Sequence, residues 1–258
     1  MHRTLFDVGP FSVHLYGVML AIAFWLGIEL SSRLAKRRDI DPTNIIDLGI
    51  VVLISSVVGS RLLFVVTHLA DYSNDPLGVF RIWEGGLSFY GGLGAGVFFG
   101  IFYIRRKRLP LGETVDIITP QIALGISLAR IGCFLNGCCF GKECSLPWAV
   151  HFPPDSQAGW TMGQVGIHPT QLYAVGANFA LFVFLRHLLR KNLPSGSVFY
   201  AFLILYGIWR FAVDFLRYYE PNMYVTALGG SITWTQLASL AIVVVGIVKL
   251  LKVGSKAA

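Results

Sequence analysis

The stretch IIDLGIVVLISSVVGSRLLFVVTH, residues 45–68, is apolar over a length that can cross a membrane. A helix rises about 1.5 Å per residue and the hydrocarbon core of a bilayer is roughly 30 Å thick, so about 20 apolar residues are enough. Six further stretches meet the same requirement, at about 12–32, 87–104, 115–137, 172–190, 197–217 and 233–252. We therefore predict an all-α integral membrane protein with seven transmembrane helices.

The composition of the chain agrees with this class. Of 258 residues, 55% are hydrophobic and only 14% are charged, and the mean hydropathy is +0.64, well above the usual value for a soluble domain. The first apolar stretch has no small-residue cleavage site after it and is longer than the core of a signal peptide, so we expect it to be retained. Without a compositional break or an internal repeat, residues 1–258 are predicted to form a single polytopic membrane domain.

Basic residues are concentrated on one side of the predicted topology. The first, third and fifth connections and the C-terminus hold 14 of the 21 Lys and Arg residues, and the opposite side holds four. Because basic connections stay in the cytoplasm, the N-terminus is predicted to lie outside and the C-terminus inside. The same distribution explains the net charge of +7 as a topology signal, so no nucleic acid partner is expected.

Three arginines fall inside predicted spans: Arg61, Arg130 and Arg210. An uncompensated charge at the centre of a bilayer costs at least about 2.5–3.5 kcal/mol, which makes each of them a candidate functional residue. The alternative is that a long side chain near a helix end extends its charged group to the interface, and this alternative is strongest for Arg61. With the predicted orientation, Arg130 and Arg210 both lie about 10 Å below the outer ends of their helices.

Other polar residues fall at the same predicted level. His14 and Tyr16 begin the first span from the outside, Tyr90 begins the third, and His168 precedes the fifth. A single His or Tyr at a membrane interface is usually part of the polar belt. Residues from several helices at one depth favour a shared site instead.

The sixth span contains the pattern YGIWRFAVDFLR, residues 206–217, in which Tyr206, Arg210, Asp214 and Arg217 would share one helical face. Arg210 and Asp214 could form a purely structural ion pair. With Arg130 and Arg217 added, the site keeps a net positive charge and suits an anion such as a phospholipid head group. Transport of a solute is less well supported, because a pathway normally places polar residues near the midplane and on both sides of it.

All four cysteines lie in one short segment, at positions 133, 138, 139 and 144. Three interpretations remain open: disulfide bonds, which persist at an outer face, packing or polar substitution, and metal or redox chemistry. The spacing does not match the paired Cys-x-x-Cys arrangement of a zinc site, so neither a metal nor a cofactor is predicted.

Five ordered blocks of the chain resemble the phosphatidylglycerol:prolipoprotein diacylglyceryl transferases of bacterial inner membranes. The blocks are HLYG at 14–17, IWEGGLSFYGGLGAG at 82–96, ARIGCFLNGCCFG at 129–141, HPTQLY at 168–173 and YGIWRFAVDFLR at 206–217. The resemblance implies transfer of a diacylglyceryl group from phosphatidylglycerol to the lipobox cysteine of a prolipoprotein signal peptide, with release of glycerol phosphate. It also implies a multi-pass protein of the bacterial cytoplasmic membrane whose active site faces the outer leaflet.

The resemblance assigns residues to the site. Arg130 and Arg210 match the two essential arginines of the family and are expected to be catalytic, by stabilising charge on the departing phosphate. Asn136 and Gly141 match the rest of the long signature block. Further positions with matching residue types are Tyr16, Asp116, Tyr206 and Arg217, and we expect Tyr16, Asn136, Gly141, Tyr206, Asp214, Arg217 and Arg61 to contact substrate.

The chain also departs from the family pattern. Tyr90 stands where most members have a histidine, so a proposed base is missing, and candidates for its role are His14, Asp214 and the lipid phosphate. Tyr90 and His14 are nevertheless expected to be catalytic, Tyr90 as a hydrogen-bond donor. Cys133 and Cys138 replace an Asn and a Glu, Asp214 replaces a Glu, and Ala174 stands where Glu is common. A lipid-binding paralogue, a transporter and a membrane thiol-redox protein are therefore the alternative functions.

Overall fold

The computed structural model of the chain describes all residues except 1–3, 9–10, 73–74, 192, 227–229 and 256–258. Its regular elements are β1 (Thr4–Val8), β2 (Phe11–His14), α1 (Leu15–Lys36), α2 (Pro42–Thr67), α3 (Phe89–Arg106), α4 (Leu111–Asn136), α5 (Gln157–Met162), α6 (Thr170–Leu188), α7 (Ser197–Val213) and α8 (Trp234–Gly254). Short 3-10 helices lie at Leu69–Tyr72, Pro76–Phe80, Ile82–Glu84 and Pro221–Met223.

A helix lies at each of the seven predicted spans. Four of them, α1, α2, α4 and α8, are long and apolar enough to cross a membrane, and α7 is a shorter apolar helix of 17 residues. The chain is therefore a multi-pass membrane protein, since several such helices occur in its described part. That all seven helices cross the membrane, and in which direction, stays a prediction.

The predicted all-α fold holds except at the N-terminus. There β1 and β2 form a two-stranded antiparallel sheet with Val8 opposite Phe11, and α1 begins only at Leu15. The predicted first span started at about residue 12, within β2, and that boundary is wrong. Hydropathy alone cannot separate a four-residue strand from the first turn of the apolar helix that follows it, because periodicity needs a longer window.

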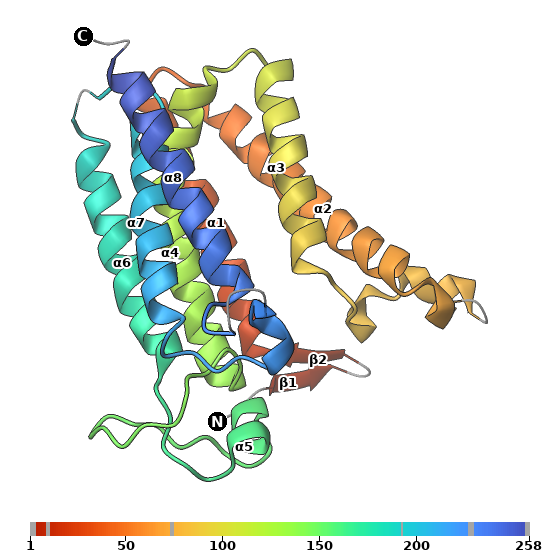
Figure 1. The fold of residues 1–258 in the computed structure, drawn as a ribbon. Coiled ribbons are helices and arrows are strands. Elements are labelled where there is room, and N and C mark those ends of the chain that lie inside the picture. The colour runs from red at the N-terminus through yellow and green to blue at the C-terminus, as the bar shows by residue number, and fades with distance from the viewer. Residues whose placement is uncertain (1–3, 9–10, 73–74, 192, 227–229, 256–258) are drawn as a thin grey trace. The chain divides into compact units, whose positions relative to one another are not determined.

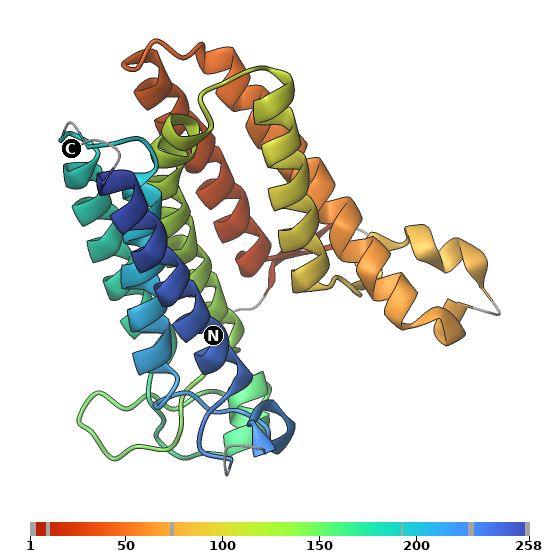
Figure 2. The ribbon, with the colours of Figure 1, turned by 45° about the horizontal axis from the view of Figure 1, so that its top comes forward.

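The chain divides into two compact units, residues 28–114 and the remaining residues 1–27 with 115–258. Within the second of these units, α4, α6, α7 and α8 run side by side (Figure 1 and Figure 2). Helices α7 and α8 approach closely at Gly207, where an added Cβ would lie 2.6 Å from Val243 Cγ2 and 3.1 Å from Ser239 O. Small residues permit this approach in a membrane, where helices associate by packing. That residues 1–258 form a single polytopic membrane domain stays a prediction.

Asp116, in the second turn of α4, fixes the start of α7. Its carboxylate accepts hydrogen bonds from the backbone N–H groups of Gly196, at 2.7 Å, and Phe199, at 2.9 Å. The first N–H groups of a helix have no partner within the helix, and an acidic group there also stabilises the helix dipole. Asp116, whose residue type matches the family, thus caps a helix in this structure.

Residues 28–114 are organised around the pair α2 and α3. At their crossing, a Cβ added at Gly91 would lie 2.3 Å from Gly59 O, and one added at Gly59 would lie 2.7 Å from Gly91 O. The two backbones therefore touch, as small residues allow between membrane helices. Of the glycines in the third predicted span, Gly91, Gly92, Gly96 and Gly100 serve this packing, whereas an added Cβ at Gly94 would have no neighbour within 4 Å.

Candidate active site

Three arginines and a tyrosine line one small cavity at the ends of α4 and α7. Arg130 comes from α4, Tyr206 and Arg210 from α7, and Arg217 from the segment after α7. The cavity has a volume of about 20 Å³. This is room for about one water molecule. The structure thus brings together four residues that the sequence predicted to share a site.

Arg210 is held by a buried network centred on Asp214. The two side chains form an ion pair, and Asp214 also accepts hydrogen bonds from Tyr219 at 2.7 Å and from Thr235 at 2.5 Å. Arg210 Nη2 donates to the same Tyr219 hydroxyl at 2.7 Å. The Asp214 side chain is fully buried and that of Arg210 is 16% exposed. Arg210 is therefore fixed in direction, and its charge is balanced by one carboxylate.

The prediction that α7 continues through Arg217 is wrong. The helix ends at Val213, and Arg217 instead lies in an isolated antiparallel bridge with Gly141. Asp214 is the residue at the helix end, so its carboxylate can accept bonds from the segments that follow. Arg217 still reaches the cavity, but through this bridge and not through a shared helical face.

Gly141 fixes the bridge because three chain segments meet there. Its N–H donates to His168 O at 3.1 Å, and the next N–H, of Lys142, donates to Leu216 O at 2.8 Å. An added Cβ at Gly141 would lie 2.5 Å from both His168 Cβ and His168 O and 2.9 Å from Leu216 O. Gly141 was predicted to contact substrate. In the structure it makes possible the backbone contacts that position Arg217.

The cavity carries excess positive charge. Within the described part of the chain, neither Arg130 nor Arg217 forms an ion pair with a carboxylate. Arg130 Nη1 lies 3.9 Å from Cys133 Sγ, and the Arg217 guanidinium lies 5.2 Å from the centre of the Tyr219 ring. Arg217 Nε is buried without a hydrogen-bond partner. Three arginines and one aspartate leave a net charge of +2, which favours an anion.

The HPTQLY block, residues 168–173, holds the turn that follows α4. Thr170 donates to Cys139 O at 3.1 Å, and Gln171 donates to Cys138 O at 2.8 Å. Cys139 has a positive φ of 59°, which is uncommon for any residue except glycine. These side-chain bonds therefore fix an unusual turn beside the cavity, to which Cys139 itself contributes.

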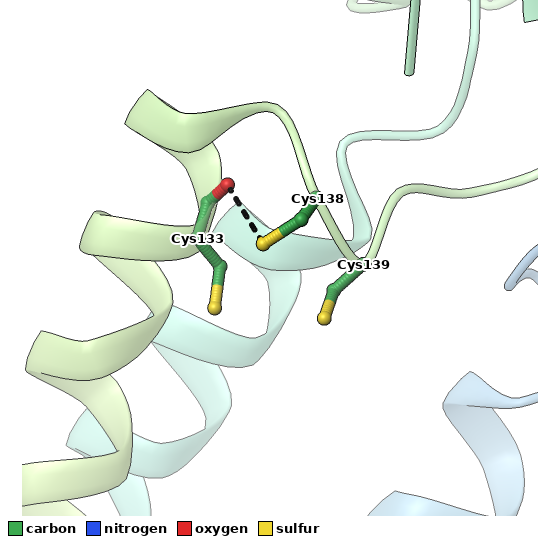
Figure 3. A group of neighbouring side chains, drawn as sticks. All are labelled: Cys133, Cys138 and Cys139. Atoms are coloured by element: carbon green, nitrogen blue, oxygen red, sulfur yellow. Dashed lines mark hydrogen bonds between the residues drawn. The ribbon is translucent and has the colours of Figure 1, made fainter. Parts of the chain in front are cut away.

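Three of the four cysteines form a cluster, which we define as Cys133, Cys138 and Cys139. All four cysteines are free thiols, and the sulfur atoms of the cluster lie within 4.8 Å of one another. Figure 3 shows the three sulfurs at the corners of a triangle between the end of α4 and the turn. Hydrogen bonds from the Cys133 and Cys138 thiols, with the charges of Arg217 and Arg130, lower the pKa of the Cys139 thiol despite its burial.

Tyr16 lies in the same unit as the cavity, whereas Asn136 lines a different hollow. Tyr16 packs on α4, where a Cβ added at Gly132 would lie 3.0 Å from Tyr16 Cδ2. Asn136 ends α4 and borders a surface hollow with residues 155–157 and Trp160. His14, at the end of β2, is exposed. The cavity therefore does not include Asn136.

Tyr90 and Arg61 belong to the unit of residues 28–114. Tyr90 lies in the first turn of α3 and is 70% exposed. Arg61 is buried, and its guanidinium donates to four backbone carbonyls, those of Gly78, Val79, Gly85 and Gly86, at 2.6–3.0 Å. Four of its five N–H groups are thereby used to hold one loop.

Sequence reasoning missed Tyr219, Thr233 and Thr235, which complete the network around Asp214. Thr233 carries a recognisable signal, since Thr233 and Gln236 form a capping box at the start of α8. That signal predicts the helix start. It contains nothing about the distant carboxylate that Thr233 and Thr235 also bind.

The model of the family described as Prolipoprotein diacylglyceryl transferase matches residues 3–252. The chain belongs to this family. Relatives named phosphatidylglycerol–prolipoprotein diacylglyceryl transferase include those of Synechococcus elongatus, 34% identical over 96% of this chain and 86% of the relative, and Geobacter sulfurreducens, 33% identical over 94% and 91%. The relative of Glaesserella parasuis is 36% identical over 94% and 89%.

Membership of the prolipoprotein diacylglyceryl transferase family confirms the resemblance found in the five sequence blocks. Two of these blocks, 129–141 and 206–217, supply the three arginines and Tyr206 of the cavity, and a third, 168–173, supports its wall. The chemistry shared by a family would be expected at such a convergence of blocks.

Proposed function

We propose that this protein transfers a diacylglyceryl group from phosphatidylglycerol to the thiol of a prolipoprotein cysteine and releases glycerol phosphate. The observation that carries the proposal is the cavity at the ends of α4 and α7, which Arg130, Arg210 and Arg217 line together. Phosphate is the anion that forked guanidinium donors bind best. The protein belongs to the prolipoprotein diacylglyceryl transferase family, and this membership indicates the reaction in which the anion site takes part.

In the proposed reaction the lipobox thiolate attacks the C3 carbon of the lipid glycerol. The C–O bond to phosphate breaks, and negative charge grows on the departing phosphate oxygen. Arg130 and Arg217, which have no carboxylate partner in the described structure, would donate to that oxygen or its neighbours. Each such donor is commonly worth about 3–4 kcal/mol in the transition state. Tyr206 lines the same cavity and is proposed to contact the head group.

Arg210 and Asp214 have a different proposed part. Asp214 already accepts bonds from Tyr219, Thr235 and Thr233 and is paired with Arg210, so it is a poor candidate for the general base. Its effect is to aim Arg210 at the cavity. The base is then His14 or the lipid phosphate, with Tyr90 as a donor or positioning group. Asn136 and Arg61 remain proposed substrate contacts only on the basis of the sequence.

The size of the cavity constrains how the lipid binds. About 20 Å³ cannot hold a phosphate group with its ester oxygens. Arg130 and Arg217 are the side chains free to separate, since Arg210 is fixed by its network. Head-group binding is therefore proposed to move these two guanidinium groups apart.

The proposed membrane placement has seven spans, the N-terminus outside, the C-terminus in the cytoplasm and the active site toward the outer leaflet. It is supported by the 14 basic residues on the predicted inner side against four on the other. The bacterial relatives favour the inner membrane. Cysteine accessibility to a membrane-impermeant reagent, read at single engineered positions in each connection, would test each assignment.

The transferase proposal is tested with purified protein, labelled phosphatidylglycerol and a peptide that carries a lipobox cysteine. We expect a thioether product and one glycerol phosphate per product. Arg130→Ala, Arg210→Ala and Arg217→Ala should each abolish turnover, whereas Arg33→Ala, at an exposed side chain, should leave it unchanged. Lipid binding without release of glycerol phosphate by the folded protein would refute the transferase proposal in favour of a lipid-binding or transport function.

A further inference from the structure

The Cys133, Cys138 and Cys139 cluster is not used by the proposed reaction. One sulfur comes from the last turn of α4 and two from the turn that follows. The spacing of the four cysteines does not predict a zinc site, because it lacks the two Cys-x-x-Cys pairs that such a site usually contains. In space, however, the fold brings the three sulfur atoms to within 4.8 Å of one another, at the end of α4 and in the turn that follows (Figure 3).

We infer that the three thiols form a binding site for a single thiophilic monovalent ion, Cu(I), in trigonal coordination beside the anion cavity. A metal–sulfur distance of about 2.3 Å places three ligands in one plane about 4.0 Å apart. In the structure the three sulfur atoms lie within 4.8 Å of one another, so small side-chain rotations are enough to bring them to this separation. Soft thiolate ligands favour Cu(I), zinc and iron–sulfur clusters over harder metal ions.

The ligand number favours Cu(I) over zinc. Zinc in structural sites is almost always four-coordinate. Among the residues that the structure describes, no further His, Cys, Asp or Glu joins this group of three. A three-coordinate ion fits the cluster without an added ligand.

The turn holds its ligands in place before an ion binds. The Cys138 N–H donates to Cys133 O at 3.1 Å, which closes the turn on the helix end. Gln171 and Thr170 bind the carbonyls of Cys138 and Cys139. Fixed backbones on all three ligands reduce the entropy lost on binding.

The surrounding charge also suits the site. Binding releases three thiol protons to solvent and leaves a complex of charge −2, with copper unchanged in oxidation state. Arg130 lies 3.9 Å from Cys133 Sγ, and Arg217 shares the cavity wall with Cys139. The two arginines balance the charge of the complex, and they are the same groups proposed to bind phosphate.

Binding is tested anaerobically with the reduced full-length protein in detergent, using Cu(I) in competition with the chromophoric chelator bicinchoninate. We expect one Cu(I) per chain and, by X-ray absorption, three sulfur ligands at about 2.3 Å. Cys133→Ser and Cys139→Ser should each weaken binding at least 100-fold. Cys144→Ser, outside the cluster, is the matched control and should bind as the unchanged protein does.

Three outcomes would overturn the inference: equal Cu(I) affinity of the unchanged protein and Cys133→Ser, equal loss in Cys144→Ser, or preferential binding of Zn(II) in the same titration. Thermal unfolding of each variant shows that it is folded. A separate arm rests on the proposed function: one equivalent of Cu(I) should inhibit transfer at least tenfold in the unchanged protein. Binding without inhibition would leave the site intact and refute only its competition with phosphate.

Discussion

Replacement of Gly141 by alanine tests whether a contact between three chain segments positions an arginine of the active site. The added Cβ would lie 2.5 Å from His168 Cβ and O and 2.9 Å from Leu216 O. Two of these atoms are backbone oxygens, which cannot rotate away as a side chain can. The segment must therefore move, and Arg217, bridged to Gly141, must move with it.

The size of the effect follows from these contacts. Overpacking of a well-packed site costs typically about 1–3 kcal/mol. For a chain of this length that corresponds to a fall of about 2–12 °C in the melting temperature. Gly176→Ala in α6 is the control, because its added Cβ has no neighbour within 4 Å and alanine favours helix by about 1 kcal/mol.

The assay combines thermal unfolding in detergent with the rate of diacylglyceryl transfer in a double-mutant cycle. If Gly141 acts through Arg217, Gly141→Ala should cost little further activity in an Arg217→Lys background, where the lysine keeps the charge and leaves a measurable rate but has lost the forked donation of the guanidinium. The coupling free energy between the two substitutions, which is the effect of the double variant minus the two single effects, should then be at least about 1 kcal/mol. Independent sites are additive to within about 0.3–0.5 kcal/mol. Additive losses would refute the positioning role, and equal melting temperatures of Gly141→Ala and Gly176→Ala would refute the steric argument.

Three further predictions concern residues around the network and the loop. Asp214→Asn should destabilise the protein by about 3–5 kcal/mol because it leaves the Arg210 charge buried without a counterion, and an unchanged melting temperature would contradict this. Arg61→Lys should lower the melting temperature and expose residues 76–86 to protease, since a lysine cannot bind four carbonyls at once, whereas Arg33→Lys should do neither. Tyr90→Phe should reduce the transfer rate about 5- to 150-fold if the hydroxyl binds a buried partner, whereas Tyr90→His should be tolerated. A shifted pH profile of the transfer rate in both variants would show instead that the phenol carries a proton.

Hydropathy predicted the positions of all seven long helices, because each of them lies in a long apolar stretch of the sequence. It predicted their ends less well. The strand Phe11–His14, in which apolar and polar residues alternate, was partly included in a helix, and α7 was extended to Arg217 although it ends at Val213. Helix ends depend on caps and on contacts with other segments, and a window of hydropathy contains neither.

The residues of the candidate site that could be predicted from the sequence are charged residues within apolar stretches. Arg130 and Arg210 are conspicuous for that reason, and the structure places both at one cavity. The partners of Asp214 were not predictable, because Thr235 is 21 residues away and looks like an ordinary helix start. The cysteine cluster could not be predicted for a related reason. The turn with positive φ at Cys139 determines which thiols lie close together, and the sequence does not give that backbone conformation.

The backbone contact of α2 and α3 at Gly59 and Gly91 has a thermodynamic consequence. In our proposed topology both helices lie in the bilayer, so separating them exposes their surfaces to lipid chains and not to water. The large heat-capacity change that accompanies the hydration of apolar groups is then missing. We expect the dissociation enthalpy of this helix pair to be nearly constant with temperature, so that it does not loosen on cooling as a water-driven interface would.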